Sequence, residues 1–365
     1  MANPQIDKLL NSAIERNASD LHLKVGYKPI LRIGGRLVRL NETVELDAEG
    51  ISLIARNLMG DAKSVKFSET NNSDFSIEYK SQNGETRRFR ANAAMADGHP
   101  YLALRVVPRE IRNVETIGFP YEVWNDIINL KRGLVLVTGV TGSGKTTTLA
   151  SLIQKINETR GDHIITIEDP VEYKYSPVKS MISQREVGID VLSFGDGVKY
   201  CLRQDPDVIL IGEIRDIETA EKALEAAATG HLVFSTLHTK SAEETVMRYV
   251  NMFPANDHDN IRDSLSANLE YVLSQQLLPY EKGGERTLAM EVMNVGYSAA
   301  IRNHLRKGEY HQLTSDIQTG RAGKMITMDA RLQQLVGAGK ISKEMAIAYA
   351  YKSDEMRKSF NRNQD

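Results

Sequence analysis

Hydrophobic residues follow two different periodicities, and the pattern changes at about residue 110. Before that point, apolar residues at helical spacing predict an amphipathic helix over 5–16, and runs that alternate apolar with polar residues predict strands. Gly34 and Gly35, between two such runs, predict a two-residue hairpin. The pattern indicates a small α+β domain over 1–110 with antiparallel strands at 21–25, 30–33, 36–40, 74–80, 88–95 and 101–107.

A linker is predicted at 111–118, and after it short apolar runs alternate with helical stretches. This alternation predicts an α/β core over 119–295, with a mostly parallel sheet covered by helices on both faces. The expected strands are 133–139, 163–169, 207–213 and 231–238, and the expected helices are 146–159, 194–204 and 218–229.

From about residue 240 the pattern becomes mainly helical. Ser241 and Glu244 have the spacing of a capping box, and one further strand is predicted at 287–294. We expect a helical carboxyl-terminal region over 296–365, whose last residues, 353–365, are solvated and disordered.

The composition excludes several classes of protein. The 365 residues carry 46 Lys+Arg against 48 Asp+Glu, a balance that does not favour a protein that coats nucleic acid or an acidic membrane. The apolar runs fall far short of the roughly 20 residues that cross a bilayer, and the amino terminus lacks the pattern of a secretory signal. The single cysteine, Cys201, allows neither an internal disulfide nor a four-cysteine zinc site, and plain packing is expected for it. We expect a soluble protein of a reducing compartment.

The segment GVTGSGKT (139–146) matches the P-loop pattern G-x-x-x-x-G-K-[ST] between a predicted strand and a predicted helix. Its glycines let backbone N–H groups converge on phosphate oxygens at a helix amino terminus. Lys145 carries a positive charge suited to the β- and γ-phosphates, and the hydroxyl of Thr146 suits Mg²⁺. The segment therefore predicts binding of a nucleoside triphosphate with Mg²⁺, through Gly139, Thr141, Gly142, Ser143, Gly144, Lys145, Thr146 and Thr147.

Two predicted strands end in carboxylates. Ligands of open α/β sheets bind beyond the carboxyl ends of the strands, so acids at these ends are candidates for the site. Glu213 follows DVILIG in the Walker B pattern, where a carboxylate holds Mg²⁺ through water or orients the attacking water. Glu168, followed by Asp169, can position or deprotonate the nucleophilic water. The alternative for each acid is a solvated strand end or a helix cap.

Two histidines flank the strand predicted at 231–238. His231 and His238 point to opposite faces and lie about 23 Å apart in an extended strand, so they cannot share one metal ion. His238, at the carboxyl end, can hydrogen-bond the γ-phosphate or an acid and thereby sense hydrolysis. His231, at the opposite end, fits packing or an interface better.

Four segments in one order (the P-loop, TIEDPVEY, DVILIGEIRD and TGHLVFSTLH) make the chain resemble the secretion ATPases, which drive type IV pili, type II secretion and type IV secretion. Residues 18–38 look like the opening of the PAS-like amino-terminal domain of that family. AIRNHLRK (300–307) is similar to the AIRNLIRE signature of pilus retraction motors, from which it departs at His304, Leu305 and Lys307. Residues 317–332 also look like these motors, so the resemblance covers nearly the whole chain.

The resemblance implies a PAS-like α+β domain, a RecA-like P-loop ATPase core and a helical carboxyl-terminal region. It implies a cytoplasmic homohexamer, peripheral at the inner membrane, which hydrolyses ATP with Mg²⁺ and powers pilus retraction and twitching motility. The implied partners are the inner-membrane platform protein and other pilus motor ATPases, without nucleic acid. By position, Lys145, Glu168 and Glu213 are catalytic, with Glu168 the base, and His231 and His238 form the His box of the nucleotide site.

The resemblance also assigns a catalytic role to arginines of the amino-terminal domain. Arg90 and Arg105, in RRFRAN and ALRVVP, are expected to reach the nucleotide as arginine fingers. Without the resemblance, both would be read as part of a solvated strand face.

Some residues depart from the family pattern and leave alternatives open. In VKYCLRQD (198–205), Lys199 replaces an arginine and Gln204 an acid, which leaves open an accessory motor. A further alternative is a non-catalytic ring subunit that binds ATP and regulates a partner motor, but the intact set of Lys145, Glu168 and Glu213 favours catalysis. A motor for type IV secretion or conjugation shares the core motifs, whereas a DNA translocase is disfavoured by the charge balance. Assembly motors usually carry four zinc-binding cysteines, so one cysteine favours retraction. The sequence leaves open the pilus system, the ring symmetry, the direction of rotation and which arginine acts in trans.

Overall fold

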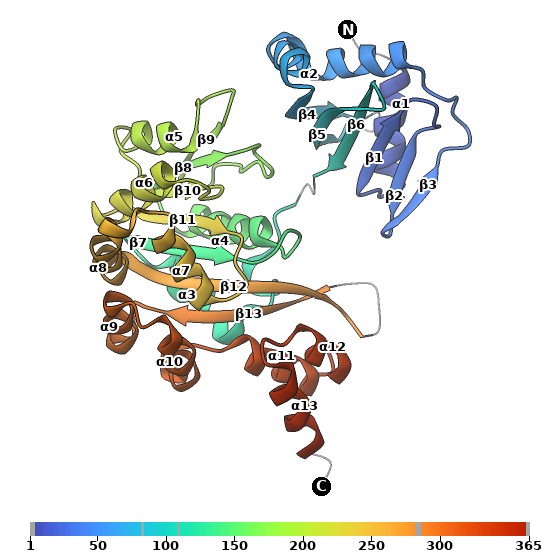
Figure 1. Cartoon of the computed structure of the whole chain (residues 1–365). Coiled ribbons are helices and arrows are strands. Elements are labelled where there is room, and N and C mark those ends of the chain that lie inside the picture. Colours follow the sequence, from blue (N-terminus) through green and yellow to red (C-terminus); the bar gives the residue numbers. More distant parts are fainter. Residues whose placement is uncertain (1–3, 82–83, 108–109, 282–285, 363–365) are drawn as a thin grey trace. The chain divides into compact units, whose positions relative to one another are not determined.

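A computed structural model describes residues 4–81, 84–107, 110–281 and 286–362 (Figure 1). The chain divides into two compact units, and we name them unit 1 (Met1–Glu110 with Pro170–Lys174) and unit 2 (Ile111–Asp169 with Tyr175–Asp365). Each unit has its own sheet and its own hydrophobic core, so each is described separately.

Unit 1 is built on a six-stranded antiparallel sheet with the order β3-β2-β1-β6-β5-β4. Its elements are α1 (Pro4–Glu15), β1 (Asp20–Lys24), β2 (Ile30–Ile33), β3 (Arg36–Arg39), α2 (Ala48–Thr70), β4 (Asn72–Lys80), β5 (Thr86–Ala96) and β6 (His99–Val106). The predicted helix and strands of this part are therefore present. Gly34 and Gly35 have φ of 56° and 82°, and two positive φ angles are what a two-residue hairpin of type I′ needs.

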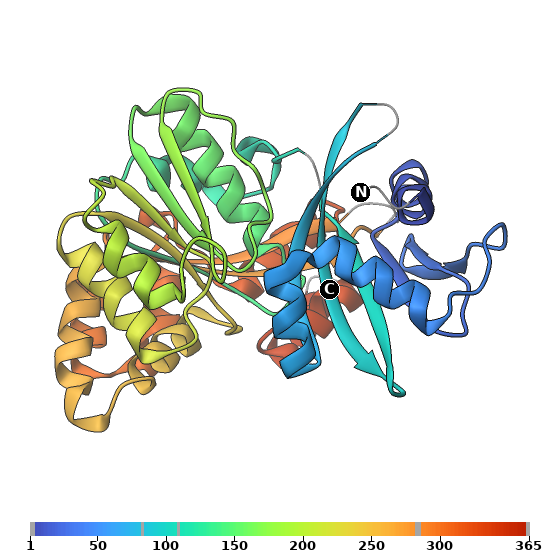
Figure 2. The ribbon, with the colours of Figure 1, turned by 90° about the horizontal axis from the view of Figure 1, so that it is seen from above.

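The helix α2 was not predicted from the sequence. Its side chains Ile51, Ile54 and Ala55 are buried in the core of unit 1, and the helix packs across β4, β5 and β6 (Figure 2). The Asp47 side chain accepts a hydrogen bond from the Gly50 N–H and caps the helix. Gly60, with φ of 69°, interrupts it, which weakens the helical signal over 48–70.

Unit 2 contains a seven-stranded sheet with the order β13-β12-β7-β11-β10-β8-β9. All neighbouring pairs are parallel except β12 with β13. Every residue of β7 and β11 is buried, so both faces of the sheet are covered, as predicted. The elements are α3 (Val123–Ile128), β7 (Gly133–Thr138), α4 (Lys145–Thr159), β8 (His163–Glu168), β9 (Met181–Glu186), α5 (Phe194–Cys201), β10 (Val208–Ile211), α6 (Ile217–Ala228), β11 (Leu232–Leu237), α7 (Ala242–Asn251), α8 (His258–Asn268), β12 (Leu269–Pro279) and β13 (Arg286–Asn294).

Two strands of this sheet correct the sequence interpretation. The region after residue 240 holds β12 as well as the expected β13, although the pattern there was read as helical. β12 lies between β7 and β13 and is mostly buried, so pairing on both sides fixes its conformation. β9, a half-exposed edge strand, was not predicted either. The expected helix at 194–204 ends already at Cys201.

Five helices follow the sheet: α9 (Ala299–Lys307), α10 (Leu313–Thr319), α11 (Met328–Gly337), α12 (Lys343–Tyr349) and α13 (Ser353–Arg362). The disordered tail predicted at 353–365 is wrong over 353–362, where α13 forms and buries Met356 in the core of this region. Residues 363–365 lie outside the described part of the chain. None of the helices that the structure describes is both long enough and apolar enough to cross a membrane.

The segment predicted as a linker, 111–118, belongs to unit 2, whereas Pro108 before it lies outside the described residues. Val114 is buried, and Lys155 Nζ contacts Glu115 Oε1 at 2.8 Å. The short 3₁₀ turns of unit 2 are Val114–Thr116, Pro120–Glu122, Ala255–Asp257, Tyr310–Gln312 and Arg321–Gly323.

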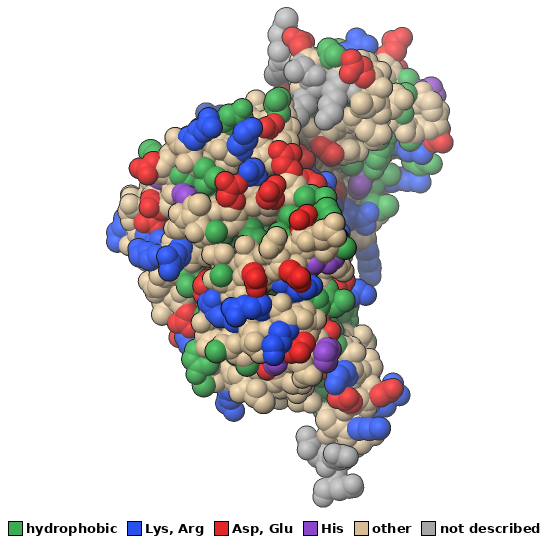
Figure 3. Space-filling model, turned by 60° about the vertical axis from the view of Figure 1, so that its left-hand side comes forward, with side chains coloured by type: hydrophobic (Ala, Val, Ile, Leu, Met, Phe, Trp, Pro, Cys, Tyr) green, Lys and Arg blue, Asp and Glu red, His purple; other side chains and the backbone are tan. Residues whose placement is uncertain are grey.

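Two local predictions in unit 2 agree with the structure. The Ser241 hydroxyl accepts the Glu244 N–H at 3.1 Å and caps α7, while the Glu244 carboxylate accepts the Lys240 N–H at 2.8 Å. Cys201 is fully buried in the core and its thiol donates to the Val198 carbonyl; burial raises the pKa of this thiol to about 12. On the face shown in Figure 3, basic and acidic side chains are interspersed.

Candidate functional site

The loop between β7 and α4 lies at the carboxyl edge of the unit 2 sheet. Gly139, Gly142 and Gly144 have φ of 144°, 80° and 91°, values that favour glycine. A Cβ at Gly139 would lie 2.4 Å from the Gln275 carbonyl oxygen and 2.5 Å from Ser143 Oγ. The loop therefore packs so closely against β12 that its first position needs glycine.

The polar groups of this loop are arranged around its backbone. Lys145 Nζ donates to the carbonyls of Gly139 at 2.7 Å and Val140 at 3.3 Å. Gln275 Nε2 donates to the Ser143 carbonyl at 2.6 Å, which ties the loop to β12. Ser143 Oγ is buried and has no hydrogen-bond partner among the described residues. A buried hydroxyl of this kind, next to a lysine at a helix amino terminus, suits an incoming phosphate oxygen.

Glu168 ends β8 and is only 7 % exposed. Its Oε1 accepts hydrogen bonds from Thr166 Oγ1 at 2.7 Å and Gln184 Nε2 at 3.3 Å. These two donors hold the carboxylate in one orientation, as a group that positions water requires. Gln184 lies on β9 and was missed because that strand was not predicted.

Glu213, just beyond β10, lies beside two basic side chains. Arg215 Nη2 contacts Glu213 Oε1 at 2.5 Å, and His238 Nε2 lies 3.5 Å from Glu213 Oε2. Partial burial and the positive charge of Lys145 lower the pKa of His238, while Glu213 opposes this shift. β7, β11 and β10 are successive parallel strands, so the P-loop, His238 and Glu213, which follow their carboxyl ends, lie at one edge of the sheet.

His231 does not join this group within the chain. It precedes β11, whose first residue is aligned with Gly133 at the start of β7, whereas the P-loop follows the end of β7. Its Nδ1 lies 3.0 Å from the Ala226 carbonyl oxygen and 3.2 Å from Thr229 Oγ1. The sequence-based placement of the two histidines at opposite ends is confirmed, and a nucleotide contact by His231 stays a prediction.

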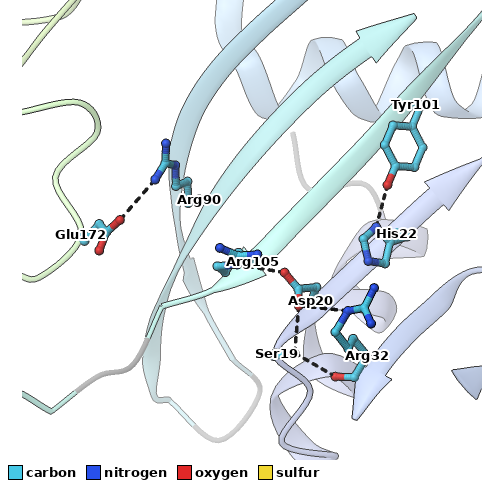
Figure 4. A network of polar contacts seen from close by, with 8 residues as sticks. All are labelled: Ser19, Asp20, His22, Arg32, Arg90, Tyr101, Arg105 and Glu172. Carbon is cyan, nitrogen blue, oxygen red and sulfur yellow. Dashed lines mark hydrogen bonds and ion pairs between the residues drawn. The ribbon is translucent and has the colours of Figure 1, made fainter. Parts of the chain in front are cut away.

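The arginines expected to reach the nucleotide lie in unit 1 (Figure 4). Arg90 and Arg105 are directly opposite each other on β5 and β6, and Arg105 is opposite Asp20 of β1. Arg90 Nη1 contacts Glu172 Oε1 at 3.2 Å, and Arg105 Nε contacts Asp20 Oδ1 at 2.9 Å. Both arginines thus have acidic partners within unit 1, and their approach to a nucleotide stays a prediction.

Asp20 was missed as the partner of Arg105, because only the strand register reveals it. It is buried, and Arg32 Nε lies 3.7 Å from its second oxygen. Burial alone would raise the pKa of Asp20, but the hydrogen bond from Ser19 and the contacts with Arg105 hold this pKa below its ordinary value. The charged carboxylate therefore orients Arg105 across the sheet (Figure 4).

The segment 300–307 forms α9, and its two arginines have different surroundings. Arg302 Nη1 donates to the carbonyls of Ser266 at 2.9 Å and Ala267 at 3.1 Å, at the end of α8. Arg306 Nε lies 3.4 Å from Asp263 Oδ1, and its side chain is 60 % exposed. Arg302 thus connects α9 to the end of α8, whereas Arg306 lies on the surface.

The comparisons with known proteins cover almost the whole chain. The sequence profile of the family described as "Type II/IV secretion system protein" matches residues 1–362. The chain belongs to this family. It is 42 % identical over 341 residues to the "Type IV pilus retractation ATPase PilT" of Pseudomonas aeruginosa, covering 93 % of this chain and 96 % of that protein.

Two further relatives place the chain within the family. The "Type IV pilus ATPase PilU" of Pseudomonas aeruginosa is 35 % identical over 354 residues, covering 97 % of this chain and 90 % of that protein. The crystal structure of the pilus retraction motor PilT with bound ADP has a TM-score of 0.87 at 42 % identity, covering 97 % of this chain and 99 % of that one. As a member of this family, the chain has an α/β fold and is an ATPase that binds a nucleotide.

Proposed function

We propose that this protein is an ATP-driven motor that powers retraction of a type IV pilus and so twitching motility. The observation that carries the proposal is the convergence of Lys145, Glu213 and His238 at the carboxyl edge of the sheet, next to a P-loop whose buried Ser143 hydroxyl has no hydrogen-bond partner in the described part of the chain. Similarity at 42 % identity across both units supports retraction over other tasks of the family.

The residues of the site have complementary tasks in ATP hydrolysis. Lys145 exchanges the carbonyls of Gly139 and Val140 for phosphate oxygens, and Ser143 donates its hydroxyl. Bound Mg²⁺ would neutralise phosphate charge. The Thr146 hydroxyl and the Glu213 carboxylate are hard oxygen ligands that suit it, directly or through water.

Glu168, oriented by Thr166 and Gln184, holds the attacking water and accepts its proton. His238 senses the state of the γ-phosphate through Glu213, to which its Nε2 lies close. This assignment makes Glu168 and Lys145 the residues on which turnover depends most.

The assembly proposed is a homohexamer that is peripheral at the inner membrane. Unit 1 corresponds to a PAS-like domain and unit 2 to a RecA-like core with a helical extension. Arg90 and Arg105 reach the nucleotide as arginine fingers and His231 serves the subunit boundary, while the platform protein receives the motion. Charges of both signs interspersed on the face shown in Figure 3 suit contacts between protein subunits.

The test of the chemistry is the Glu168→Gln variant, which keeps shape and hydrogen-bonding capacity but removes the base. It is expected to bind ATP with nearly unchanged affinity and to hydrolyse it at least about a hundredfold more slowly. Asp169→Asn, at the exposed neighbouring position, is the matched control and is expected to retain turnover. Unchanged hydrolysis in Glu168→Gln would contradict the assignment.

The test of the biological role is a strain without the gene, examined for surface pili and twitching. Excess pili without movement are expected, because extension continues while retraction stops. Bald cells would instead indicate an assembly motor, and normal movement would indicate an accessory subunit.

A further inference from the structure

Four buried hydroxyl groups form a chain of hydrogen bonds behind the candidate site. Thr138 Oγ1 donates to Ser274 Oγ at 2.8 Å, and Thr245 Oγ1 lies 3.3 Å from Thr138 Oγ1. Thr239 Oγ1 lies 2.7 Å from Thr245 Oγ1. None of the four residues is more than 1 % exposed, so the groups can satisfy one another but not exchange partners with bulk water.

Three of the four hydroxyl-bearing residues lie next to functional residues in the sequence. Thr138 is the last residue of β7 and precedes Gly139, the first residue of the P-loop. Thr239 follows His238 directly, and Ser274 precedes Gln275, which holds the Ser143 carbonyl. Thr245, on the first turns of α7, is the residue through which the P-loop side and the His238 side are connected.

The Thr245 hydroxyl has one proton but lies near three oxygen atoms that could accept it. Besides Thr138 and Thr239, its Oγ1 lies 2.7 Å from the Ser241 carbonyl oxygen. A hydroxyl has one proton, so Thr245 donates to one of these oxygens at a time: the Ser241 carbonyl, Thr138 Oγ1 or Thr239 Oγ1. Rotation of the Thr245 hydroxyl changes which of its neighbours, Thr138 at the end of β7 or the residues before α7, receives this hydrogen bond. A group with two alternative partners is suited to follow small displacements of the P-loop.

We propose that Thr245 is a positioning residue for ATP hydrolysis, which couples the P-loop, through Thr138, to His238, through Thr239. Thr245 acts through these neighbours, and so fixes where the imidazole lies relative to Glu213. The proposal rests on the proposed ATPase function. A displacement of His238 slows the chemical step while the phosphate cradle, held by Gln275 and the backbone, still binds ATP.

The experiment uses the full chain with two substitutions of different chemistry. Thr245→Val removes the hydroxyl at nearly constant volume and is expected to lower kcat about tenfold with KM for ATP within about twofold of wild type. Thr245→Ser keeps the hydroxyl and is expected to restore most of kcat. Ser266→Ala removes another buried hydroxyl, whose one hydrogen bond to a described residue is with the Asp263 carbonyl. This variant is the control for a loss of stability without a loss of turnover.

The decisive measurement is the effect of Thr245→Val on kcat in a protein that also carries His238→Ala. A residue that acts through His238 loses its effect when His238 is absent. Thr245→Val is expected to change kcat by less than about twofold in that background. A tenfold effect in both backgrounds would overturn the proposal, and so would wild-type kcat in Thr245→Val. If that variant does not fold, Thr239→Val breaks the same chain and is judged by the same two comparisons.

The experiments distinguish a wrong role for Thr245 from a wrong proposed function. A wild-type chain that hydrolyses no ATP would remove the proposed function itself. A wild-type chain that hydrolyses ATP, with Glu168→Gln inactive and Thr245→Val fully active, would overturn the role of Thr245 alone.

Discussion

Glu291 offers a quantitative test of how unit 2 holds its carboxyl-terminal helices. This residue of β13 is 3 % exposed. Its Oε1 accepts the Ala242 N–H at 2.8 Å and its Oε2 accepts the Met328 N–H at 3.3 Å, so one carboxylate caps the first residues of α7 and α11. Burial raises the pKa of Glu291 from 4.5 to about 7, against the opposing effect of these two hydrogen bonds.

The raised pKa has a definite consequence for stability. Between pH 4.5 and 7 the unfolded chain has lost this proton while the native protein keeps it, so stability falls as pH rises through this interval and levels off above it. One pKa unit corresponds to about 1.4 kcal/mol, and the whole shift therefore amounts to about 3 kcal/mol. Most of this change falls between pH 5 and pH 8.

The assay compares thermal unfolding of wild type and Glu291→Gln at pH 5 and at pH 8. Glutamine cannot ionise, so the Tm of the variant is expected to gain roughly 5–10 °C relative to wild type on going from pH 5 to pH 8. Any constant difference between the two proteins reflects altered capping and does not enter the comparison. Parallel pH profiles for both proteins would refute the reasoning.

Four further substitutions test the site and the carboxyl-terminal region. Gly139→Ala is expected to abolish nucleotide binding, measured with a fluorescent ATP analogue, because its Cβ would lie 2.4 Å from the Gln275 carbonyl; full binding would contradict the packing. Lys145→Ala is expected to lose ATP hydrolysis in a phosphate-release assay while keeping the wild-type Tm. Arg302→Ala is expected to lower Tm by several degrees through its lost carbonyl contacts, whereas Arg306→Ala keeps Tm and hydrolysis but impairs retraction; equal effects of the two would contradict the distinction.

The parts of the structure that the sequence predicted are those with local causes. The P-loop, the Gly34-Gly35 hairpin and the Ser241 cap depend on φ angles and hydrogen bonds within a few residues, so their residue types disclose them. The parallel sheet was predicted for a different reason: strands covered by helices on both faces are apolar along their whole length, and this pattern is visible in the sequence.

The parts of the structure that the sequence did not predict depend on contacts between residues far apart in the sequence. β12 follows α8 without a turn residue, and Leu269, Val272 and Leu273 fit helical spacing as well as a strand. Only pairing with β7 and β13 decides its conformation, and with it the place of Gln275 against the P-loop. Register likewise set the Asp20–Arg105 pair, which no local pattern contains. The motif residues could therefore be predicted from the sequence. The residues that support the site could not, because strand pairing over long sequence distances places them.

The burial of Cys201 has a practical consequence for measuring motion. It is the sole thiol of the chain, it has no exposed surface, and its pKa of about 12 keeps it protonated at neutral pH. Maleimide and methanethiosulfonate reagents react with accessible thiolates, so the native chain is expected to stay unlabelled. One cysteine engineered on the surface of each unit would then carry a dye pair without background, and energy transfer between the dyes could follow the distance between the units through a cycle of ATP hydrolysis.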